Sequence, residues 1–431
     1  MKQYDAIIIG GGLGGLTTAA MLSKEGLSVC ILEQHGTVGG CLQSFKRQGY
    51  VLDTGMHYVG SLSEGRIMHQ YFKYLGIIDS LHLRKLDEKG FDHFHFGDGT
   101  SYCHAMGYDN FTDTLSARFP EERKNIEAIS RTIREVGNLI DPEILKQGRL
   151  SNNGAGYMSL SAYGEIERNI RNDKLRNVLA GNAGLYAGNK LTTSLYEYGM
   201  ITHSNIEGAY AFVDGSQQIA WRLEEKINSN GGEVVLNAKV SKIHLNKDRV
   251  EYVLLDSGEI FYGKWIISSL HPALTFSMLE NNFVYKKAFF TRMKSLQNTY
   301  GMFTTYLLIK PETLEYANRN HYMFNNPDVW ATVGEYKGFN IPSTLLCMQP
   351  DSKSRYTKVV TLLTPMPYSV YQKWENTTLE NRGEDYIEFK EKFSEAVIDF
   401  VCQFFPDLRS CIKAKYTASP LTYRDYTSTP G

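Results

Sequence analysis

Five glycines in six positions, from Gly10 to Gly15, form the strongest chemical signal in the chain. Gly10, Gly12 and Gly15 have the GxGxxG spacing, and Leu13 and Gly14 complete the loop. In this motif the first glycine permits a tight turn, the second lets the backbone approach a pyrophosphate, and the third lets a helix pack closely on a strand. The loop therefore predicts a dinucleotide phosphate site.

The segments around this loop read as the strand, helix and strand that must position it. Tyr4–Ile9 is an apolar run typical of a buried parallel strand, and a helical pattern follows the loop as far as Gly26. A second strand, Ser28–Leu32, leads to Glu33, whose carboxylate can accept hydrogen bonds from both ribose hydroxyls and would repel a 2′-phosphate. The free N–H groups of the helix would face the phosphates.

A second glycine pair and a further motif extend this unit. Gly39 and Gly40 precede Cys41, and DTGMHYVG occupies 53–60. With these motifs the chain resembles the phytoene desaturase-like flavoproteins of the amine oxidase superfamily, in the branch of the all-trans-retinol 13,14-reductases and carotenoid isomerase-like proteins. The resemblance is most specific in the first 60 residues and continues at 207–210, 215–217, 231–243 and 420–431.

The resemblance implies an α/β fold with FAD extended across a Rossmann-type domain and an α+β substrate domain beside it. The expected FAD-binding domain comprises 1–75 and 206–272, because α/β texture returns after Asp214, and the substrate domain comprises 76–205 and 273–420. In the resembled family a glycine-rich segment and a final strand and helix with further flavin contacts follow the position of Gly431. We therefore expect the C-terminal part of the FAD-binding domain to be missing from this sequence.

The resemblance also assigns cofactor contacts. Glu33 would bind the adenosine ribose, Gly12–Gly15 the pyrophosphate, Gly55–His57 would lie near the isoalloxazine ring, and Val240 would contact the adenine through its backbone. The complete set of expected FAD-binding residues is Gly10, Gly12, Leu13, Gly14, Gly15, Glu33, Gln34, Gly40, Cys41, Gly55, Met56, His57 and Val240. His57 is expected to bind, and no catalytic residue is assigned.

Two positions depart from the pattern of the resembled family. The arginine that follows the glycine pair in many amine oxidases is Cys41 here, which argues against amine oxidation. A loop position that is usually glycine is Asp214. Downstream, Ser216 is a candidate N-cap for a helix through Ile227.

The remaining chain predicts structure more than chemistry. An apolar stripe from Ile126 to Ile140 predicts a helix that starts near Pro120, and a second helix is expected near 386–404. Two separate strands are expected at Glu259–Tyr262 and Lys264–Ser269. His93 and His95 alternate in a strand-like stretch and could reach one metal ion, but an HxH pair without a third ligand is more often structural, so no metal site is expected.

Composition excludes several classes of partner. The chain has 46 Lys and Arg residues and 47 Asp and Glu residues, so it lacks the excess of positive charge that is typical of nucleic-acid-binding proteins. Six dispersed cysteines without a CxxC pair, and no run long enough to cross a membrane, favour a cytoplasmic protein in a reducing compartment. Peripheral contact with a membrane stays open, because apolar substrates often partition there.

Three functions are compatible with these observations. The first is an FAD-dependent oxidoreductase that saturates, desaturates or isomerises C–C/C=C bonds of an apolar, isoprenoid-like substrate. A net reduction would draw electrons from NAD(P)H or from a redox partner protein. The alternatives are a flavin amine oxidase and a non-catalytic, truncated flavoprotein.

Overall fold

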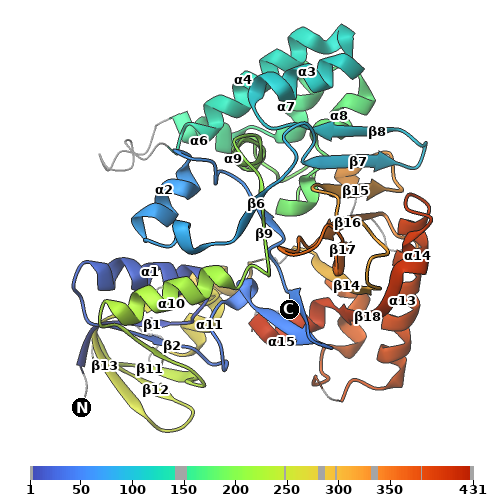
Figure 1. Ribbon diagram of the computed structural model, residues 1–431. Coiled ribbons are helices and arrows are strands. Elements are labelled where there is room, and N and C mark those ends of the chain that lie inside the picture. Colours follow the sequence, from blue (N-terminus) through green and yellow to red (C-terminus); the bar gives the residue numbers. More distant parts are fainter. Residues whose placement is uncertain are drawn as a thin grey trace.

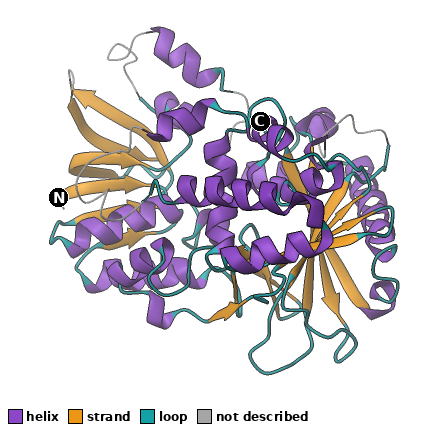
Figure 2. Cartoon of the chain, turned by 90° about the horizontal axis from the view of Figure 1, so that it is seen from above, coloured by secondary structure: helices purple, strands orange, loops and turns teal. Residues whose placement is uncertain are grey.

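The computed structural model describes residues 3–140, 153–246, 249–279, 287–296, 299–331, 338–379 and 381–427. Two large sheets organise these residues, one of six strands and one of seven (Figure 1). Seen from above, the sheets lie at opposite sides of the molecule with helices between them (Figure 2). Neither large sheet is built from one continuous stretch of sequence.

The six-stranded sheet holds the glycine loop. Its order is β10-β2-β1-β13-β12-β11; the first four strands run parallel, and β12 and β11 extend the sheet antiparallel. Helices α1 and α10 pack together over one face. Both faces are covered, so the central strands are apolar throughout. The bounds are β1 (Gln3–Ile9), α1 (Leu13–Lys24), β2 (Val29–Leu32), α10 (Gln218–Ser229), β10 (Glu233–Val235), β11 (Val240–Asn246), β12 (Arg249–Leu255) and β13 (Ile260–Ser268).

Two local predictions for this domain were wrong. The strands expected at 259–262 and 264–269 are one strand, β13, which pairs antiparallel with β12 at its start and parallel with β1 over most of its length. Gly263 lies against the Ile7 side chain and allows this continuous strand to pass close to β1. Ser216 does not cap α10, since Gln217 occupies the N-cap position, and the Ser216 hydroxyl instead donates to the Leu42 oxygen and Asp53.

The seven-stranded sheet has the order β18-β14-β17-β16-β15-β7-β8. Neighbouring strands are antiparallel except β15 and β7, which run parallel, so a hairpin from near residue 100 completes a sheet whose other strands lie beyond residue 300. The bounds are β7 (Asp92–Phe96), β8 (Ser101–His104), β14 (Gly301–Ile309), β15 (Asn320–Phe324), β16 (Ser343–Met348), β17 (Val359–Met366) and β18 (Ile412–Ala418).

Helices cover both faces of this sheet. One face packs against α3 (Tyr108–Arg118), α4 (Arg123–Gly137), α7 (Ala162–Asn169), α8 (Asp173–Leu179) and α9 (Leu195–Ile206), and the other against α13 (Glu384–Cys402) and α14 (Leu408–Cys411). The predicted helices near 120–140 and 386–404 are confirmed as α4 and α13. Helix α4 begins three residues after Pro120, because Pro120–Glu122 form a 3₁₀ turn, η3, that leads into it.

Short elements join the two large sheets. A three-stranded sheet, β5-β9-β6, and a hairpin, β3-β4, lie between them, and α15 lies there too (Figure 1). None of the helices within the described ranges combines the length and apolar character that crossing a bilayer requires. The remaining bounds are β3 (Ser44–Arg47), β4 (Tyr50–Asp53), β5 (Tyr58–Val59), α2 (Ile67–Tyr74), β6 (Leu83–Lys85), α6 (Asn153–Ser159), β9 (Tyr210–Phe212), α11 (Pro272–Ser277), α12 (Lys287–Lys294), α15 (Pro420–Thr427) and the 3₁₀ turns η1 (Gly40–Leu42), η2 (Ile78–Ser80), η4 (Ala183–Tyr186), η6 (Val329–Ala331) and η7 (Tyr368–Trp374).

Candidate functional site

The glycine loop has the geometry that its spacing predicts. It joins the end of β1 to the start of α1, and Gly10 adopts φ +100°, a conformation that favours glycine. A Cβ on Gly15 would lie 2.0 Å from the Gly10 oxygen, so only glycine allows this contact. A Cβ on Gly12 would meet no atom within 4 Å, so nothing in the protein itself requires glycine there. Space beside Gly12 is what an approaching pyrophosphate needs.

Glu33 is held against the loop. Its carboxylate accepts hydrogen bonds from the Gly11 N–H at 2.6 Å and from the His35 N–H at 2.9 Å. These contacts fix the carboxylate at the carboxyl end of β2, beside the loop, where the ribose of a dinucleotide is expected.

Three further predicted residues lie around the same sheet. Gln34 lies next to Glu33, and its amide nitrogen is 3.3 Å from the His35 Nε2. Val240 starts β11 and is buried among residues of the sheet. Leu13 begins α1 and is exposed.

The segments around Gly40 and Gly55 meet directly. Gly40 lies so close to Gly12 that a Cβ on it would be 3.1 Å from the Gly12 Cα. Gly55 packs on Cys41 in the same way: a Cβ on Gly55 would lie 2.8 Å from the main-chain oxygen of Cys41. The structure thus brings the glycine loop, the glycine pair and the 53–57 loop into one continuous surface.

Asp53 anchors the 53–57 loop. Its Oδ1 accepts hydrogen bonds from the Ser44 hydroxyl at 2.9 Å and from the Ser216 N–H at 2.9 Å. Asp214 has φ +66°, which explains why glycine is usual at this position, and aspartate is among the residues that tolerate this conformation. The departure at Asp214 therefore leaves the loop geometry in place.

His57 lies at the edge of the cavity, and its side chain is half-buried. Its Nε2 has no hydrogen-bond partner within the described part of the chain. Burial lowers the pKa of His57, and the nearby Asp53 opposes this effect only in part, so the ring is neutral at neutral pH. An unpartnered buried nitrogen indicates that a further group completes the site.

A cavity of about 1430 Å³ opens beside these residues. Cys41 and the stretch Thr54–Gly60 line one side, and strands β14 to β17 with η4 line the other. The lining is mostly apolar or aromatic and includes Leu185, Ile201, Leu296, Tyr300, Met302, Tyr322, Phe324, Trp330, Leu345, Leu363, Tyr368 and Tyr423. Sequence reasoning missed these residues, because those on strands alternate as in any buried sheet and the others lie in helices, turns and loops far apart along the chain.

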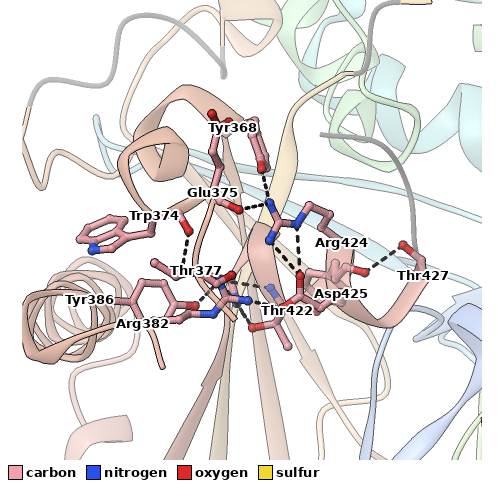
Figure 3. Close-up of polar contacts among 12 residues, drawn as sticks. Tyr368, Trp374, Glu375, Thr377, Arg382, Tyr386, Thr422, Arg424, Asp425 and Thr427 are labelled. Carbon is pink, nitrogen blue, oxygen red and sulfur yellow. Dashed lines mark hydrogen bonds and ion pairs between the residues drawn. The ribbon is translucent and has the colours of Figure 1, made fainter. Parts of the chain in front are cut away.

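Arg424 is the one lining residue with a formal charge among those that the structure describes. Its Nη1 donates to the Tyr368 hydroxyl at 2.9 Å and to the main-chain oxygen of Glu375 at 2.7 Å. Its Nε and Nη2 donate to the Asp425 carboxylate (Figure 3). Asp425 also pairs with the buried Arg382, which donates to the Thr377 hydroxyl at 3.0 Å. Two guanidinium groups thus share one carboxylate, so this wall of the cavity carries positive charge.

A polar network links Tyr58 in the 54–60 stretch to Tyr322 on β15. The Tyr58 hydroxyl lies 3.0 Å from the Asp92 Oδ2 and 2.7 Å from the Tyr322 hydroxyl, and Asn320 donates to the Asp92 Oδ1 at 2.9 Å. Burial raises the pKa of Asp92 to about 7, against the lowering effect of the hydrogen bonds from Asn320 and Tyr58. A single sequence offers no signal for this network, because its members lie far apart along the chain.

The HxH pair belongs to a histidine cluster on the other face of the seven-stranded sheet. His95 Nε2 lies 3.0 Å from His321 Nδ1, and His93 Nε2 lies 3.0 Å from the Arg319 guanidinium. Within the described residues no cluster of three His, Cys, Asp or Glu side chains is arranged to hold a metal ion. His95 and His321 pack against Phe405, which follows α13, and none of the three histidines lines the cavity.

Comparison with known proteins decides the family. The family model described as "Flavin containing amine oxidoreductase" matches residues 13–275. The chain belongs to this family. All-trans-retinol 13,14-reductase from Danio rerio is 25% identical, over 100% of this chain and 77% of that protein. Prolycopene isomerase 2, chloroplastic, from an Oncidium hybrid cultivar is 24% identical, over 99% of this chain and 74% of that protein.

Solved structures show the same fold. Putrescine oxidase bound to putrescine superposes with a TM-score of 0.63 at 15% identity, over 97% of this chain and 85% of that chain. Cyclohexylamine oxidase from Brevibacterium oxydans IH-35A superposes with a TM-score of 0.62 at 15% identity, over 100% of this chain and 87% of that chain. The predicted α/β class and the predicted family resemblance are confirmed.

The residues present fit the cofactor of this family. A flavin dinucleotide requires an open approach to Gly12, a carboxylate at Glu33 and space beside the 53–57 loop, and the structure provides all three. The unpartnered Nε2 of His57 lies at the end where the ring system is expected. The chain is therefore an oxidoreductase with a flavin cofactor.

Proposed function

We propose that this protein is an FAD-dependent oxidoreductase that acts on C–C/C=C bonds of an apolar, isoprenoid-like substrate. Saturation, desaturation and flavin-dependent isomerisation are the three reactions of this class. The observation that carries the proposal is the cavity, which joins the 53–57 loop to a wall of aromatic and aliphatic side chains. Its volume of about 1430 Å³ exceeds the roughly 300–1,000 Å³ of ordinary ligand pockets. Room therefore remains for a long apolar molecule beside a flavin ring.

FAD would bind across the first domain in this proposal. Glu33 would accept hydrogen bonds from the ribose, Gly12–Gly15 with the first N–H groups of α1 would hold the pyrophosphate, and Gly55–His57 would contact the ring system. Flavins carry hydride and one-electron chemistry themselves, so the protein supplies position and exclusion of water. The packing of Gly40 on Gly12 and of Gly55 on Cys41 fixes the two ends of this binding surface relative to each other.

The sequence relatives support the substrate class. Two of them are named for the reduction of all-trans-retinol and the isomerisation of prolycopene. The cavity also disfavours an amine. No carboxylate lies among its described lining residues, and the positive charge around Arg424 and Arg382 would repel an ammonium group. Cys41, in place of the arginine of many amine oxidases, agrees with this choice.

The electron donor and the location belong to the proposal as well. A saturating enzyme consumes one pair of electrons for each double bond, and NAD(P)H or a redox protein would supply them. An isomerase returns to its starting redox state and needs no net supply. Peripheral contact of an otherwise cytoplasmic protein with a membrane would give it access to an apolar substrate.

Flavin titration of the purified chain tests the cofactor assignment. We expect FAD to bind and the Glu33→Gln variant to bind it roughly 10- to 100-fold more weakly, because hydrogen bonds to a charged group contribute about 1.5–3 kcal/mol. Glu259→Gln, at an exposed turn, is the matched control and should bind FAD like the wild type. Equal affinity of the Glu33→Gln variant and the wild type would contradict the assigned ribose contact.

A further inference from the structure

We propose that Tyr322, Tyr58 and Asp92 form a proton relay, in which the Tyr322 hydroxyl exchanges a proton with a substrate carbon. The relay deepens the proposed function and rests on it. Adding or removing a C=C bond moves a proton as well as a hydride, and no residue has so far been assigned to carry that proton. Tyr322 would be the catalytic residue, while Tyr58 and Asp92 would act through it.

The relay runs from the cavity wall into the protein interior. Tyr58 and Tyr322 both line the cavity, and their hydroxyl oxygens are 2.7 Å apart. Tyr58 lies between the other two groups, at 3.0 Å from the Asp92 Oδ2. Because the Tyr58 hydroxyl contacts both neighbours, Tyr322 is the terminal hydroxyl on the cavity side. Asp92 is fully buried at the inner end.

Three strands from distant parts of the chain fix this geometry. Tyr58 lies in β5 of the small central sheet, Asp92 in β7 and Tyr322 in β15. The parallel register of β7 and β15 pairs Asp92 with Asn320, whose side-chain amide donates to the carboxylate at 2.9 Å. Asn320 thus occupies the Asp92 Oδ1 and leaves Oδ2 for exchange with Tyr58.

The direction of the hydrogen bonds depends on the charge of Asp92. With Asp92 as a carboxylate, Tyr58 donates to it, Tyr322 donates to Tyr58, and a lone pair of Tyr322 remains for a proton from the substrate. With Asp92 protonated, both hydroxyls rotate, and the Tyr322 proton is directed into the cavity. One set of side chains therefore acts as a base in the first state and as an acid in the second.

Asp92 is the group in this network that titrates near neutral pH. Burial raises its pKa to about 7. Burial also raises the pKa values of Tyr58 and Tyr322 well above the usual tyrosine value, so neither hydroxyl gives up its proton without receiving another. The other titratable side chains packed nearby stay neutral: burial raises the pKa of Cys347 on β16 and of Tyr186 in η4, and lowers that of His104 on β8 to about 3.

The proposed step balances in both directions. In saturation, a reduced flavin would supply a hydride, with its two electrons, to one alkene carbon, and the other carbon would gain the Tyr322 proton. Tyr58 would pass its proton to Tyr322 and receive the Asp92 proton, so Asp92 would end as a carboxylate and the flavin would be left oxidised. Desaturation reverses each transfer. Isomerisation uses the protonation and its reversal without net electron transfer.

Infrared difference spectroscopy on the chain without substrate tests whether Asp92 holds the proton of the relay. We expect a C=O band of a protonated carboxyl group that disappears as the pH rises through about 7, and that is absent from Asp92→Asn. Tyr58→Phe removes a hydrogen bond that favours the carboxylate, so it should shift this titration to higher pH. Tyr4→Phe is the matched control, since the buried Tyr4 hydroxyl donates to Glu233 at the far end of β1. Two results would overturn the relay. One is a wild type with no titrating C=O band, and the other is a titrating band that persists in Asp92→Asn.

Reaction rates test the catalytic role. Tyr322→Phe should lower the rate of C=C reduction by roughly 10²-fold or more, with little change in KM, and Tyr4→Phe should not. The wild-type rate of reduction should fall as pH rises through about 7, because the acid form is lost, and Asp92→Asn should lose this dependence. An unchanged rate in Tyr322→Phe would overturn the relay but leave the proposed function standing. A wild type that converts no polyene would overturn the proposed function and the catalytic role, whatever the infrared titration shows.

Discussion

The Tyr423 hydroxyl donates a hydrogen bond to the main-chain oxygen of Thr54 at 3.1 Å, although the two residues lie 369 positions apart. The same hydroxyl lies 2.5 Å from that of Thr304 on β14. Tyr423 therefore connects α15, the seven-stranded sheet and the 53–57 loop. Tyr423 also lines the cavity, so under the proposed function this contact would hold the 53–57 loop in place beside the substrate.

Replacing this tyrosine tests the connection. Tyr423→Phe keeps the ring but removes hydrogen bonds that contribute about 1 kcal/mol, so FAD affinity should fall roughly 5-fold. Tyr416→Phe on β18 is the control, because its hydroxyl contacts Gln48 and it does not line the cavity. Equal losses in both variants would show that the effect is not specific to the loop. FAD titration by fluorescence measures the difference.

Gly12 and Gly15 should respond differently to alanine. Gly12→Ala places a methyl group in open space, so the variant should unfold like the wild type but bind FAD at least 10-fold more weakly. Gly15→Ala forces a methyl group against the Gly10 oxygen and should lower the free energy of unfolding by about 1–3 kcal/mol. Urea unfolding and FAD titration on both variants separate the two effects. A Gly12→Ala variant with full FAD affinity would show that the pyrophosphate binds elsewhere.

The local unit was predictable and the relay was not. Gln3 to Glu33 form one strand–helix–strand segment, in which residues close in sequence are also close in space. Asp92 and Tyr322 lie 34 and 264 positions from Tyr58 and meet only because β7 inserts beside β15. Nothing in the local pattern of either strand specifies that parallel pairing. The single strand β13 was missed for a similar reason. Its first residues pair with β12, and most of its later residues pair with β1.

Acid should destabilise the fold through its buried histidines. Burial lowers the pKa of His104 to about 3, and burial together with the charges of His95, His93 and Arg319 lowers that of His321 to about 3. Below pH of about 6.5 the unfolded chain therefore binds protons that the folded chain does not, and stability falls. His321→Gln should reduce the loss of unfolding free energy between about pH 7 and pH 5 by about 1–2 kcal/mol. Urea unfolding at the two pH values measures it, and an unchanged pH dependence would contradict the account.

Gly184 offers a test of the cavity as the substrate site. It lines the cavity, and its Cβ would meet no atom within 4 Å, so Gly184→Phe adds a ring to the cavity without a clash at the backbone. We expect a raised KM that is larger for long polyenes than for short ones, with FAD affinity unchanged. Gly154→Phe is the control, since Gly154 is also free of contacts and lies outside the cavity lining. Equal KM changes in both variants would place the substrate elsewhere.

One measurement tests the central claim most directly. The FAD-loaded protein is reduced without oxygen and mixed with all-trans-retinol, with a cis-configured carotene or with putrescine, while the spectra of flavin and polyene are recorded. We predict that the polyene spectrum changes, either with reoxidation of the flavin if a double bond is saturated or at constant flavin redox state if it is isomerised. In the same experiment with oxidised flavin, putrescine should leave the flavin band unchanged. Unchanged polyene spectra, together with bleaching of the oxidised flavin by the amine, would contradict the proposed function.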